Sequence, residues 1–329
     1  MKLAFFGCGY IGEKRSKDRG NHDVVGVYDP DQGRAQKLAN DLNTKSYACE
    51  DSLLKESNAD IIVVATTNRE LAPLTLKAIM AKKHVLVEKP GSISVNEVNQ
   101  LRQAAAQNKV AVKVGFNHRF HPALLKARQL IDDGQLGEMM YLRARYGHGA
   151  RVGYEKEWRS IPELSGGGEL LDQGVHILDL IYWYLGPLPL QSSFVTTSFW
   201  DMKVDDNAVL TLSDKKRWAT FHVSCSEWKN TFSIELYGRT GKILINGLGR
   251  SYGKETLTYY KMLPEMGPPI IETFDFNEKD ESWLLDLENL VDHVKNQKPL
   301  WGDLESASYA LEQVRAAYRQ NGYKLPCSV

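Results

Sequence analysis

Short apolar runs alternate with helix-like patterns along the first third of the chain. Two segments, Gln32–Leu42 and Val95–Asn108, repeat apolar residues on one helix face. The runs between such segments are aliphatic or aromatic, as in strands buried on both faces of a parallel sheet. They are Leu3–Phe6, Val24–Tyr28, Ile61–Ala65, Val85–Val87 and Val110–Val114. This alternation predicts strand–helix–strand units and a doubly wound parallel sheet.

The pattern changes after about residue 120. A helix is predicted over Pro122–Asp132, an alternating run follows at Met139–Tyr146, and an apolar helix ends near Gly186. The next β-like runs have no helices between them, which predicts a mainly antiparallel sheet. They include Phe194–Phe199, Val209–Leu212, Trp218–Ser224, Ser233–Tyr237 and Lys242–Ile245, and two helices, Glu281–Asn296 and Asp303–Gln320, come last. We therefore predict an α/β nucleotide-type domain over residues 1–119 and an α+β domain with an open sheet over 120–329.

Composition narrows the class of protein without naming a function. A chain of 329 residues suggests about two domains of roughly 150 residues each. The 41 basic residues balance 41 acidic ones, so nothing suggests a nucleic-acid partner. No apolar run reaches the roughly 18 residues that span a bilayer, and the apolar run near the N-terminus is too short for a secretory leader. Scattered cysteines predict reduced thiols in a cytoplasmic protein rather than disulfides or a zinc site; they are Cys8, Cys49, Cys225 and Cys327.

A GxGxxG motif, residues 7–12, directly follows the first predicted strand. Glycines are needed there for the tight turn and for close approach of the backbone to a pyrophosphate. The second strand ends at Asp29, whose carboxylate can accept hydrogen bonds from the adenosine ribose hydroxyls and would repel a 2′-phosphate. The motif therefore predicts NAD rather than NADP. The alternative is a purely structural turn with an aspartate that caps the next helix.

Basic residues follow two of the predicted strands. The first group lies just after the glycine motif, and we interpret it as a solvated helix face rather than a phosphate site; it consists of Lys14, Arg15, Lys17 and Arg19. After the fourth strand, a single lysine, Lys89, lies within Val87-Glu88-Lys89-Pro90. Ligands of open α/β sheets bind beyond the carboxyl ends of the strands, and Pro90 restricts the backbone of Lys89. The alternative for Lys89 is an exposed loop lysine.

An aspartate and a histidine share one predicted helix after three consecutive glycines, residues 166–168. Asp172 and His176 are four residues apart and so lie on one helix face, and Asp179 could orient the histidine ring. Histidine can take a proton from a hydroxyl at neutral pH. The pair could equally be structural. His118 and His121 form an HxxH, but no further ligands stand at a recognisable spacing, so we expect no metal.

These motifs, in this order, resemble the Gfo/Idh/MocA family, the group of glucose–fructose oxidoreductase and inositol dehydrogenase. The resemblance rests on the GxGxxG, the EKP at 88–90 and the GGGxxxDxGxHxxD at 166–179, and it covers essentially the whole chain. Residues 65–68, Ala-Thr-Thr-Asn, and 115–120, Gly-Phe-Asn-His-Arg-Phe, are similar as well, although Leu71 stands where members often carry a histidine. The resemblance implies a Rossmann domain followed by a domain whose open sheet carries substrate on one side and often oligomer contacts on the other. A homodimer or homotetramer is therefore expected.

The resemblance also implies an NAD-dependent oxidoreductase with Lys89, Asp172 and His176 as its catalytic residues. Hydride would pass between NAD and a secondary alcohol or ketone of a sugar, an inositol or a nucleotide-linked sugar. The expected cofactor contacts are Gly7, Gly9, Tyr10, Ile11, Gly12, Asp29, Thr66, Thr67, Asn68, Glu88 and Lys89. The expected substrate contacts are Lys89, Asn117, Arg119, Asp172 and His176, together with Arg151, Tyr154 and Trp158. These last three belong to the stretch 146–159, whose polar, aromatic and basic residues could line a substrate pocket; the alternative for it is an ordinary surface loop.

Two other functions remain open on the sequence alone. One is a non-catalytic sensor of dinucleotide or sugar on the same fold, because a fold does not prove an activity. Such a sensor would be expected to lose Lys89, Asp172 or His176, and all three are present. The other is an NADP-dependent diol dehydrogenase, against which Asp29 argues.

Overall fold

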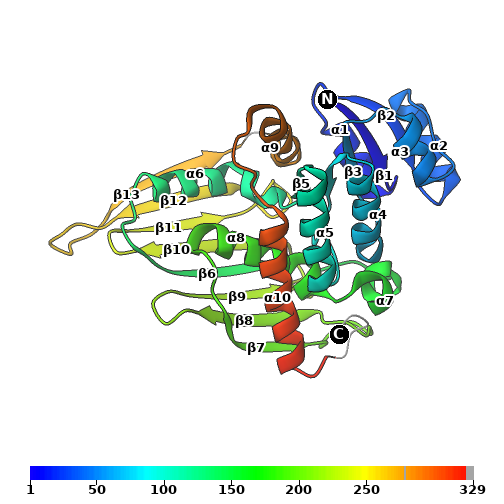
Figure 1. Cartoon of the computed structure of the whole chain (residues 1–329). Coiled ribbons are helices and arrows are strands. Elements are labelled where there is room, and N and C mark those ends of the chain that lie inside the picture. The colour runs from blue at the N-terminus through cyan, green and yellow to red at the C-terminus, as the bar shows by residue number, and fades with distance from the viewer. Residues whose placement is uncertain (278, 324–329) are drawn as a thin grey trace. The chain divides into compact units, whose positions relative to one another are not determined.

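The computed structural model describes residues 1–277 and 279–323 (Figure 1). The chain divides into two compact units. The first is formed by Met1–Asn117 together with Trp283–Ser308, and the second by His118–Ser282 and the chain from Tyr309 on. The predicted division after residue 119 lies close to the point where the chain leaves the first unit. It does not include the return of residues 283–308 to that unit, which no sequence pattern signals.

The first unit contains a five-stranded parallel sheet in the order β2-β1-β3-β4-β5. Its strands are β1 (Lys2–Phe6), β2 (Asp23–Tyr28), β3 (Ile61–Val64), β4 (His84–Val87) and β5 (Val112–Val114). The helices are α1 (Tyr10–Lys17), α2 (Gln32–Leu42), α3 (Glu50–Glu56), α4 (Asn68–Met80), α5 (Val95–Asn108) and, from the returning segment, α9 (Ser282–Asn296). Because the strands are buried on both faces, their sequences read as continuous apolar runs. The predicted parallel sheet is confirmed.

Helix α9 completes the core of the first unit. Its Leu287, Leu290 and Val291 are buried in one cluster with Leu3 and Phe5 of β1. Burying a side chain of this kind contributes roughly 1.5–3 kcal/mol relative to leaving it exposed. The returning segment is therefore part of this unit's hydrophobic core.

The second unit is built on an eight-stranded sheet in the order β13-β12-β11-β10-β6-β9-β8-β7. Neighbouring strands are antiparallel except for β6 and β9, which are parallel, so the predicted mainly antiparallel sheet is confirmed. The strands are β6 (Met139–Gly147), β7 (Leu190–Thr196), β8 (Asn207–Ser213), β9 (Trp218–Ser224), β10 (Thr231–Gly238), β11 (Gly241–Asn246), β12 (Glu255–Lys261) and β13 (Ile270–Phe276).

Helices cover one face of this sheet (Figure 1). The α-helices of the segment between residues 118 and 282 are α6 (Pro122–Asp132), α7 (Pro162–Ser165) and α8 (Val175–Leu185), and α10 (Leu304–Gln320) follows later. Short 3₁₀ turns are η1 (Asn117–Phe120), η2 (Tyr154–Lys156) and η3 (Trp158–Ser160), and η4 (Leu170–Gly174) is a π-helix. Strand β10 alternates buried and partly exposed residues, as expected for a sheet with one covered face.

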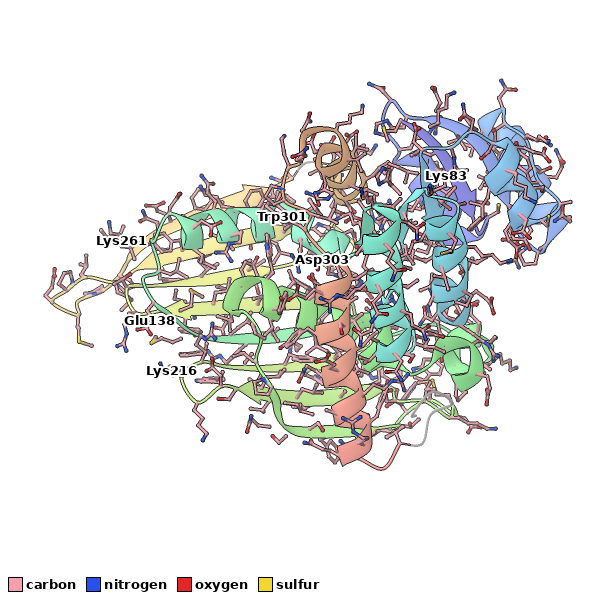
Figure 2. All side chains as sticks on the ribbon, in the orientation of Figure 1. Lys83, Glu138, Lys216, Lys261, Trp301 and Asp303 are labelled. Atoms are coloured by element: carbon pink, nitrogen blue, oxygen red, sulfur yellow. The ribbon has the colours of Figure 1, made fainter. Side chains whose placement is uncertain are left out.

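The loops that lie next to the candidate site leave the eight-stranded sheet at one of its two ends. Glu138, Lys216 and Lys261 mark one end, at the turns that flank β6, β9 and β12 (Figure 2). The other end is set by the register that pairs Gly147 with Ser224 and Ser224 with Asn207. The loops that leave the sheet there begin at His148 and Cys225. These loops lie next to the residues of the candidate site.

One strand differs from its predicted bounds. Strand β7 ends at Thr196, not at Phe199, because the next N–H groups turn to a side chain. The carboxylate of Asp206 accepts hydrogen bonds from the backbone of Ser198, Phe199 and Trp200 at 2.7–3.0 Å.

No helix among the described residues is long and apolar enough to cross a membrane. Cys8, Cys49 and Cys225 are free thiols, and Cys327 lies outside the described residues.

Candidate active site

The glycine motif joins β1 to α1, and two of its three glycines leave no room for a side chain. A Cβ on Gly7 would lie 2.2 Å from the carbonyl oxygen of Ala65, and one on Gly12 would lie 2.1 Å from that of Gly7. Gly7 also has a φ of +98°, which favours glycine. A Cβ on Gly9 would meet nothing within 4 Å, so glycine leaves open space beside the first N–H groups of α1. A pyrophosphate needs both that space and those N–H groups. The loop therefore fits NAD.

Asp29 follows β2 and is tied to the glycine motif. Its Oδ2 accepts a hydrogen bond from the N–H of Cys8, and its Oδ1 accepts one from the N–H of Asp31, both at 2.8 Å. The residue that caps α2 is Asp31, which accepts from Gly33 and Arg34, so Asp29 is not the capping aspartate. Each oxygen of Asp29 keeps a lone pair for a ribose hydroxyl. Its geometry fits the predicted ribose acceptor.

The other predicted cofactor contacts follow β1 and β3, whose carboxyl ends share one edge of the sheet. Tyr10 begins α1 with a side chain that is 80% exposed, and Ile11 is partly exposed. Thr66 precedes α4, Thr67 is its N-cap and Asn68 is its first residue, which is buried. This edge is where ligands of doubly wound sheets bind. The contacts of these residues with NAD stay predictions.

Glu88 belongs to a buried network of four charges within the first unit. Arg15 donates from Nε to Glu88 and from Nη1 to Asp286, each at 2.7 Å. Lys113 Nζ lies 3.1 Å from the other oxygen of Asp286. All four side chains are at most 9% exposed. The network links α1, β5 and α9 to the residue that precedes Lys89.

The prediction that Arg15 lies on a solvated helix face is wrong. Its guanidinium is buried among two carboxylates, which supply the pairing that a buried charge requires. Asp286 stands far along the chain, so the pattern around the glycine motif could not reveal it. Gly115 is required by the same network, because its Cβ would lie 2.5 Å from Nη2 of Arg15.

Lys89 follows Glu88 in a tight turn at the end of β4. The N–H of Gly91 donates to the carbonyl of Glu88 at 2.9 Å, and the Lys89–Pro90 peptide bond is cis. The lysine side chain is half-buried. The alternative of a fully exposed loop lysine therefore does not describe Lys89.

In the second unit, Asp205 anchors the start of the helix that carries Asp172 and His176. Its carboxylate accepts the N–H groups of Gly168 at 3.0 Å and Leu170 at 2.7 Å, and the hydroxyl of Tyr318 at 2.6 Å. A Cβ on Gly168 would lie 2.1 Å from the carbonyl oxygen of Asp205, which explains the glycine. Burial raises the pKa of Asp205 to about 6 although these donors oppose the rise. Both anchoring residues are far away along the chain and were missed in the sequence.

Asp172 and His176 are both buried, and they stand on a helix that changes type between them. Residues Leu170–Gly174 form the π-helix η4, and α8 continues from Val175. The sequence predicted a regular helix here. π-turns of this kind are frequent at functional sites.

The ring of His176 stacks on that of His118, with 3.8 Å between the centroids and 14° between the planes. His118 Nε2 is 3.1 Å from the hydroxyl of Tyr146. Burial raises the pKa of Tyr146 well above its ordinary value, so the phenol is neutral. Tyr146 belongs to the stretch 146–159 that was predicted as a possible pocket lining, whereas His118 was not among the predicted contacts.

The two histidines of the HxxH serve different partners. His118 stacks on His176, whereas His121 Nδ1 lies 3.3 Å from Glu255. Within residues 1–277 and 279–323, no group of three or more His, Cys, Asp or Glu side chains could hold a metal ion.

Asp179 and Arg119 form a buried ion pair within the second unit. Arg119 donates from Nε and Nη2 to the two oxygens of Asp179 at 2.8 and 2.6 Å, and both side chains are buried. Asp179 therefore pairs with Arg119, and its task of orienting the ring of His176 stays a prediction. The pair joins η1 to α8, and the substrate contact of Arg119 also stays a prediction. Asn117, the first residue of η1, is buried.

The loop between β6 and α7 holds the remaining predicted substrate contacts. Arg151 is 68% exposed and lies 2.7 Å from Glu157. Tyr154 is buried, and its burial raises its pKa far above the ordinary value. Trp158 lies under the guanidinium of Arg159, 4.7 Å from its ring centroid. Arg159, which was not among the predicted contacts, donates from Nε to Asp172 at 3.2 Å.

A second acidic residue lies one turn before Asp172. Glu169 is fully buried, with His148 Nε2 at 3.5 Å from Oε1. Burial lowers the pKa of His148, but the carboxylate of Glu169 outweighs it and the net shift is upward. His148 belongs to the stretch 146–159 that was predicted as a possible pocket lining, but Glu169 was not predicted. Their pairing depends on the return of the chain from β6 to the helix.

Comparison with known proteins agrees with this geometry. Residues 1–116 match the model of the oxidoreductase family with an NAD-binding Rossmann fold, and residues 124–244 match the GFO/IDH/MocA C-terminal domain. The two matches cover most of the chain, and the chain belongs to the Gfo/Idh/MocA family of oxidoreductases. Its first unit is the family's NAD-binding Rossmann domain.

Several relatives and solved structures resemble the chain. Glucose-6-phosphate 3-dehydrogenase of Bacillus subtilis is 29% identical over 202 residues, which cover 60% of this chain and 56% of that protein. The scyllo-inositol 2-dehydrogenase (NAD(+)) of the same organism is 24% identical over 93% of this chain and 90% of its own length. A levoglucosan dehydrogenase complex with NADH and levoglucosan shares the fold, with a TM-score of 0.87 at 16% identity and coverage of 97% and 98% of the two chains.

Proposed function

We propose that this protein is an NAD-dependent dehydrogenase or reductase acting on a secondary alcohol or ketone of a ring polyol: a sugar, an inositol or a nucleotide-linked sugar. The observation that carries the proposal is the buried helix segment that brings Asp172 and His176 together, anchored by Asp205. Family membership, the open space at Gly9 and the free lone pairs on Asp29 support the cofactor. The dehydrogenase names among the relatives support the substrate class.

Each catalytic residue has a separate task in this proposal. The glycine motif and Asp29 would hold NAD, which would supply the hydride acceptor for the carbinol carbon of the substrate. His176 takes the proton of the hydroxyl as the carbonyl forms, because imidazole accepts protons at neutral pH. Lys89 donates to the same oxygen and so places positive charge where negative charge develops. Asp172 accepts a hydrogen bond from Lys89 or from a neighbouring substrate hydroxyl.

An absorbance assay tests the function directly. In separate reactions, the protein is mixed with NAD and one candidate substrate. The candidates are myo-inositol, scyllo-inositol, glucose 6-phosphate, levoglucosan and UDP-N-acetylglucosamine. Growth of the reduced nicotinamide band with at least one of these ring polyols is expected. Binding of NAD without turnover of any of them, in either direction, would favour the sensor alternative.

The carboxylate of Asp29 is expected to decide the choice between NAD and NADP. In Asp29→Asn, we expect NAD to bind about tenfold more weakly, since a charged acceptor is worth roughly 1–1.5 kcal/mol more than the neutral amide oxygen that replaces it. The affinity for NADP should fall less than that for NAD, or rise, because the 2′-phosphate of NADP no longer meets a negative charge. Calorimetric titration with both nucleotides measures this, with Asp31→Asn as the matched control. Tighter binding of NADP than NAD by the unaltered protein would contradict the assignment.

We also propose that the protein works in the cytoplasm as a homodimer or homotetramer that uses the outer face of the eight-stranded sheet. The scattered free thiols support the compartment. The rings of Trp218, Tyr141 and Tyr237 stack across β9, β6 and β10, with centroids 4.4 and 4.3 Å apart. Exposed Phe194 and Val209 lie on neighbouring strands. Apolar surface of this kind marks contact sites.

The proposed assembly predicts a particle of two or four chain masses in light scattering at micromolar concentration. Trp218→Glu places a charge at one end of the row of stacked rings and should shift the protein to monomers. A monomeric unaltered protein would refute this part of the proposal.

A further inference from the structure

A row of alternating charges crosses the loop between β6 and α7 and ends on Asp172. Arg151 Nη2 lies 2.7 Å from Oε1 and 2.8 Å from Oε2 of Glu157. Arg159 Nη1 lies 3.7 Å from Glu157, and Arg159 Nε donates to Asp172 Oδ2 at 3.2 Å. The four residues all belong to the second unit. Asp172 therefore has the guanidinium of Arg159 beside it, a contact that the sequence did not predict.

The position of Arg159 is fixed from several sides. Its side chain is 28% exposed, and its guanidinium lies over the ring of Trp158. The carboxylates of Asp172 and Glu157 raise its pKa against the effect of burial, so the residue is charged at every working pH. A guanidinium held in this way has little freedom to leave Asp172.

A second buried carboxylate lies near Asp172, so a fixed cation beside Asp172 offsets the repulsion between the two negative charges. Glu169 is one turn before Asp172 on the same helix, and it adds a second buried carboxylate. Titratable groups of other second-unit elements whose charges interact with Asp172 include Tyr146, His148, Tyr154, Arg159, Cys225 and Tyr252. Only Arg159 in that set is permanently charged, since the phenols and the thiol are neutral and His148 lies against Glu169. His176 follows one turn later.

We propose that Arg159 is a positioning residue that keeps Asp172 ionised and aimed at its hydrogen-bond partner in the substrate complex. A cation close to a carboxylate favours the ionised form, typically by one to three pH units, and opposes the effect of burial and of a neighbouring carboxylate. This inference rests on the proposed function, because Asp172 acts on the substrate only if the protein is a dehydrogenase.

Two substitutions separate charge from geometry. Arg159→Met removes the cation but keeps much of the side-chain length, and Arg159→Lys keeps the cation but loses the planar fork. In Arg159→Met, we expect the acidic limb of the pH profile of kcat/KM to move upward by about one unit. At neutral pH kcat should fall about tenfold. Arg159→Lys should restore the limb to within a few tenths of a unit while kcat stays lower.

A matched control is available at the opposite end of the sheet. Arg217 pairs with Asp214 at 2.6 Å, and hydrogen bonds from Arg217 hold the pKa of that carboxyl at about 2. Arg217→Met should raise the pKa of Asp214 and leave the pH profile of kcat/KM in place. Thermal unfolding and NAD titration of every variant show whether the fold and the cofactor site are intact.

Titration of the ¹³C-labelled carboxyl of Asp172 by NMR tests the inference without turnover. An upward shift of its pKa in Arg159→Met, and not in Arg217→Met, supports the role of Arg159. An unchanged pKa, or a fall in kcat with no movement of the acidic limb, would overturn it. Failure of the proposed function would look different: no sugar would be turned over by the unaltered protein, yet the carboxyl titration could still be read.

Discussion

Replacing His176 by alanine is expected to lower kcat about 10²–10⁴-fold, because positioned proton transfer supplies an acceleration of that size. The dissociation constant of NAD should change less than about twofold, since His176 stands in the second unit and the glycine motif in the first. Stopped-flow absorbance gives kcat, and calorimetry gives the affinity. The stacked ring of His118 has its Nε2 3.1 Å from the hydroxyl of Tyr146.

His222→Ala provides the control for this variant. His222 lies on β9 of the same unit, partly exposed, with its Nε2 3.1 Å from Asn207. Its loss should leave kcat within about twofold of the unaltered protein. Added imidazole should restore part of the turnover of His176→Ala and none of that of the control. Turnover of His176→Ala equal to that of the unaltered protein would remove His176 from the role of base.

The largest effect on stability is expected at Asp286. Asp286→Ala leaves the charges of Arg15 and Lys113 buried with Glu88 as the remaining carboxylate of the network. Breaking a buried pair on one side typically costs about 3–5 kcal/mol of unfolding free energy. Because the side chain also holds α9 beside α1, we expect the loss in the first unit. Urea unfolding followed by circular dichroism measures it.

The exposed pair of Lys254 and Asp275 gives the comparison. Its atoms approach to 2.7 Å, but both side chains are about half exposed. Asp275→Ala should therefore cost no more than about 1 kcal/mol. Equal losses in Asp286→Ala and Asp275→Ala would show that the buried network contributes nothing beyond a surface ion pair.

Much of the fold was readable from the sequence, because it depends on local pattern. The strands of the first unit are buried on both faces and give continuous apolar runs, and the glycine motif marks a turn that other residues cannot adopt. The alternating runs after residue 190 gave the antiparallel sheet. The family motifs added candidate site residues that periodicity alone would not select.

What the sequence could not show are contacts between distant residues. Arg15 looked like a surface residue because its acidic partner Asp286 comes from the returning helix α9. Asp172 receives Arg159 from a loop of no regular pattern, and Asp205 and Tyr318 reach the triple glycine from two other elements. Pairings of this kind are set by tertiary packing, for which a single sequence has no signal.

Transfer of deuterium tests the central claim most directly. The ring polyol that reduces NAD fastest is prepared with deuterium on its carbinol carbons, and the nicotinamide product is analysed by NMR and mass spectrometry. One deuterium per turnover at C4 of the reduced ring is predicted, because the hydride comes straight from carbon. Reduced nicotinamide without the label, or no reduced nicotinamide with any ring polyol, would contradict the account.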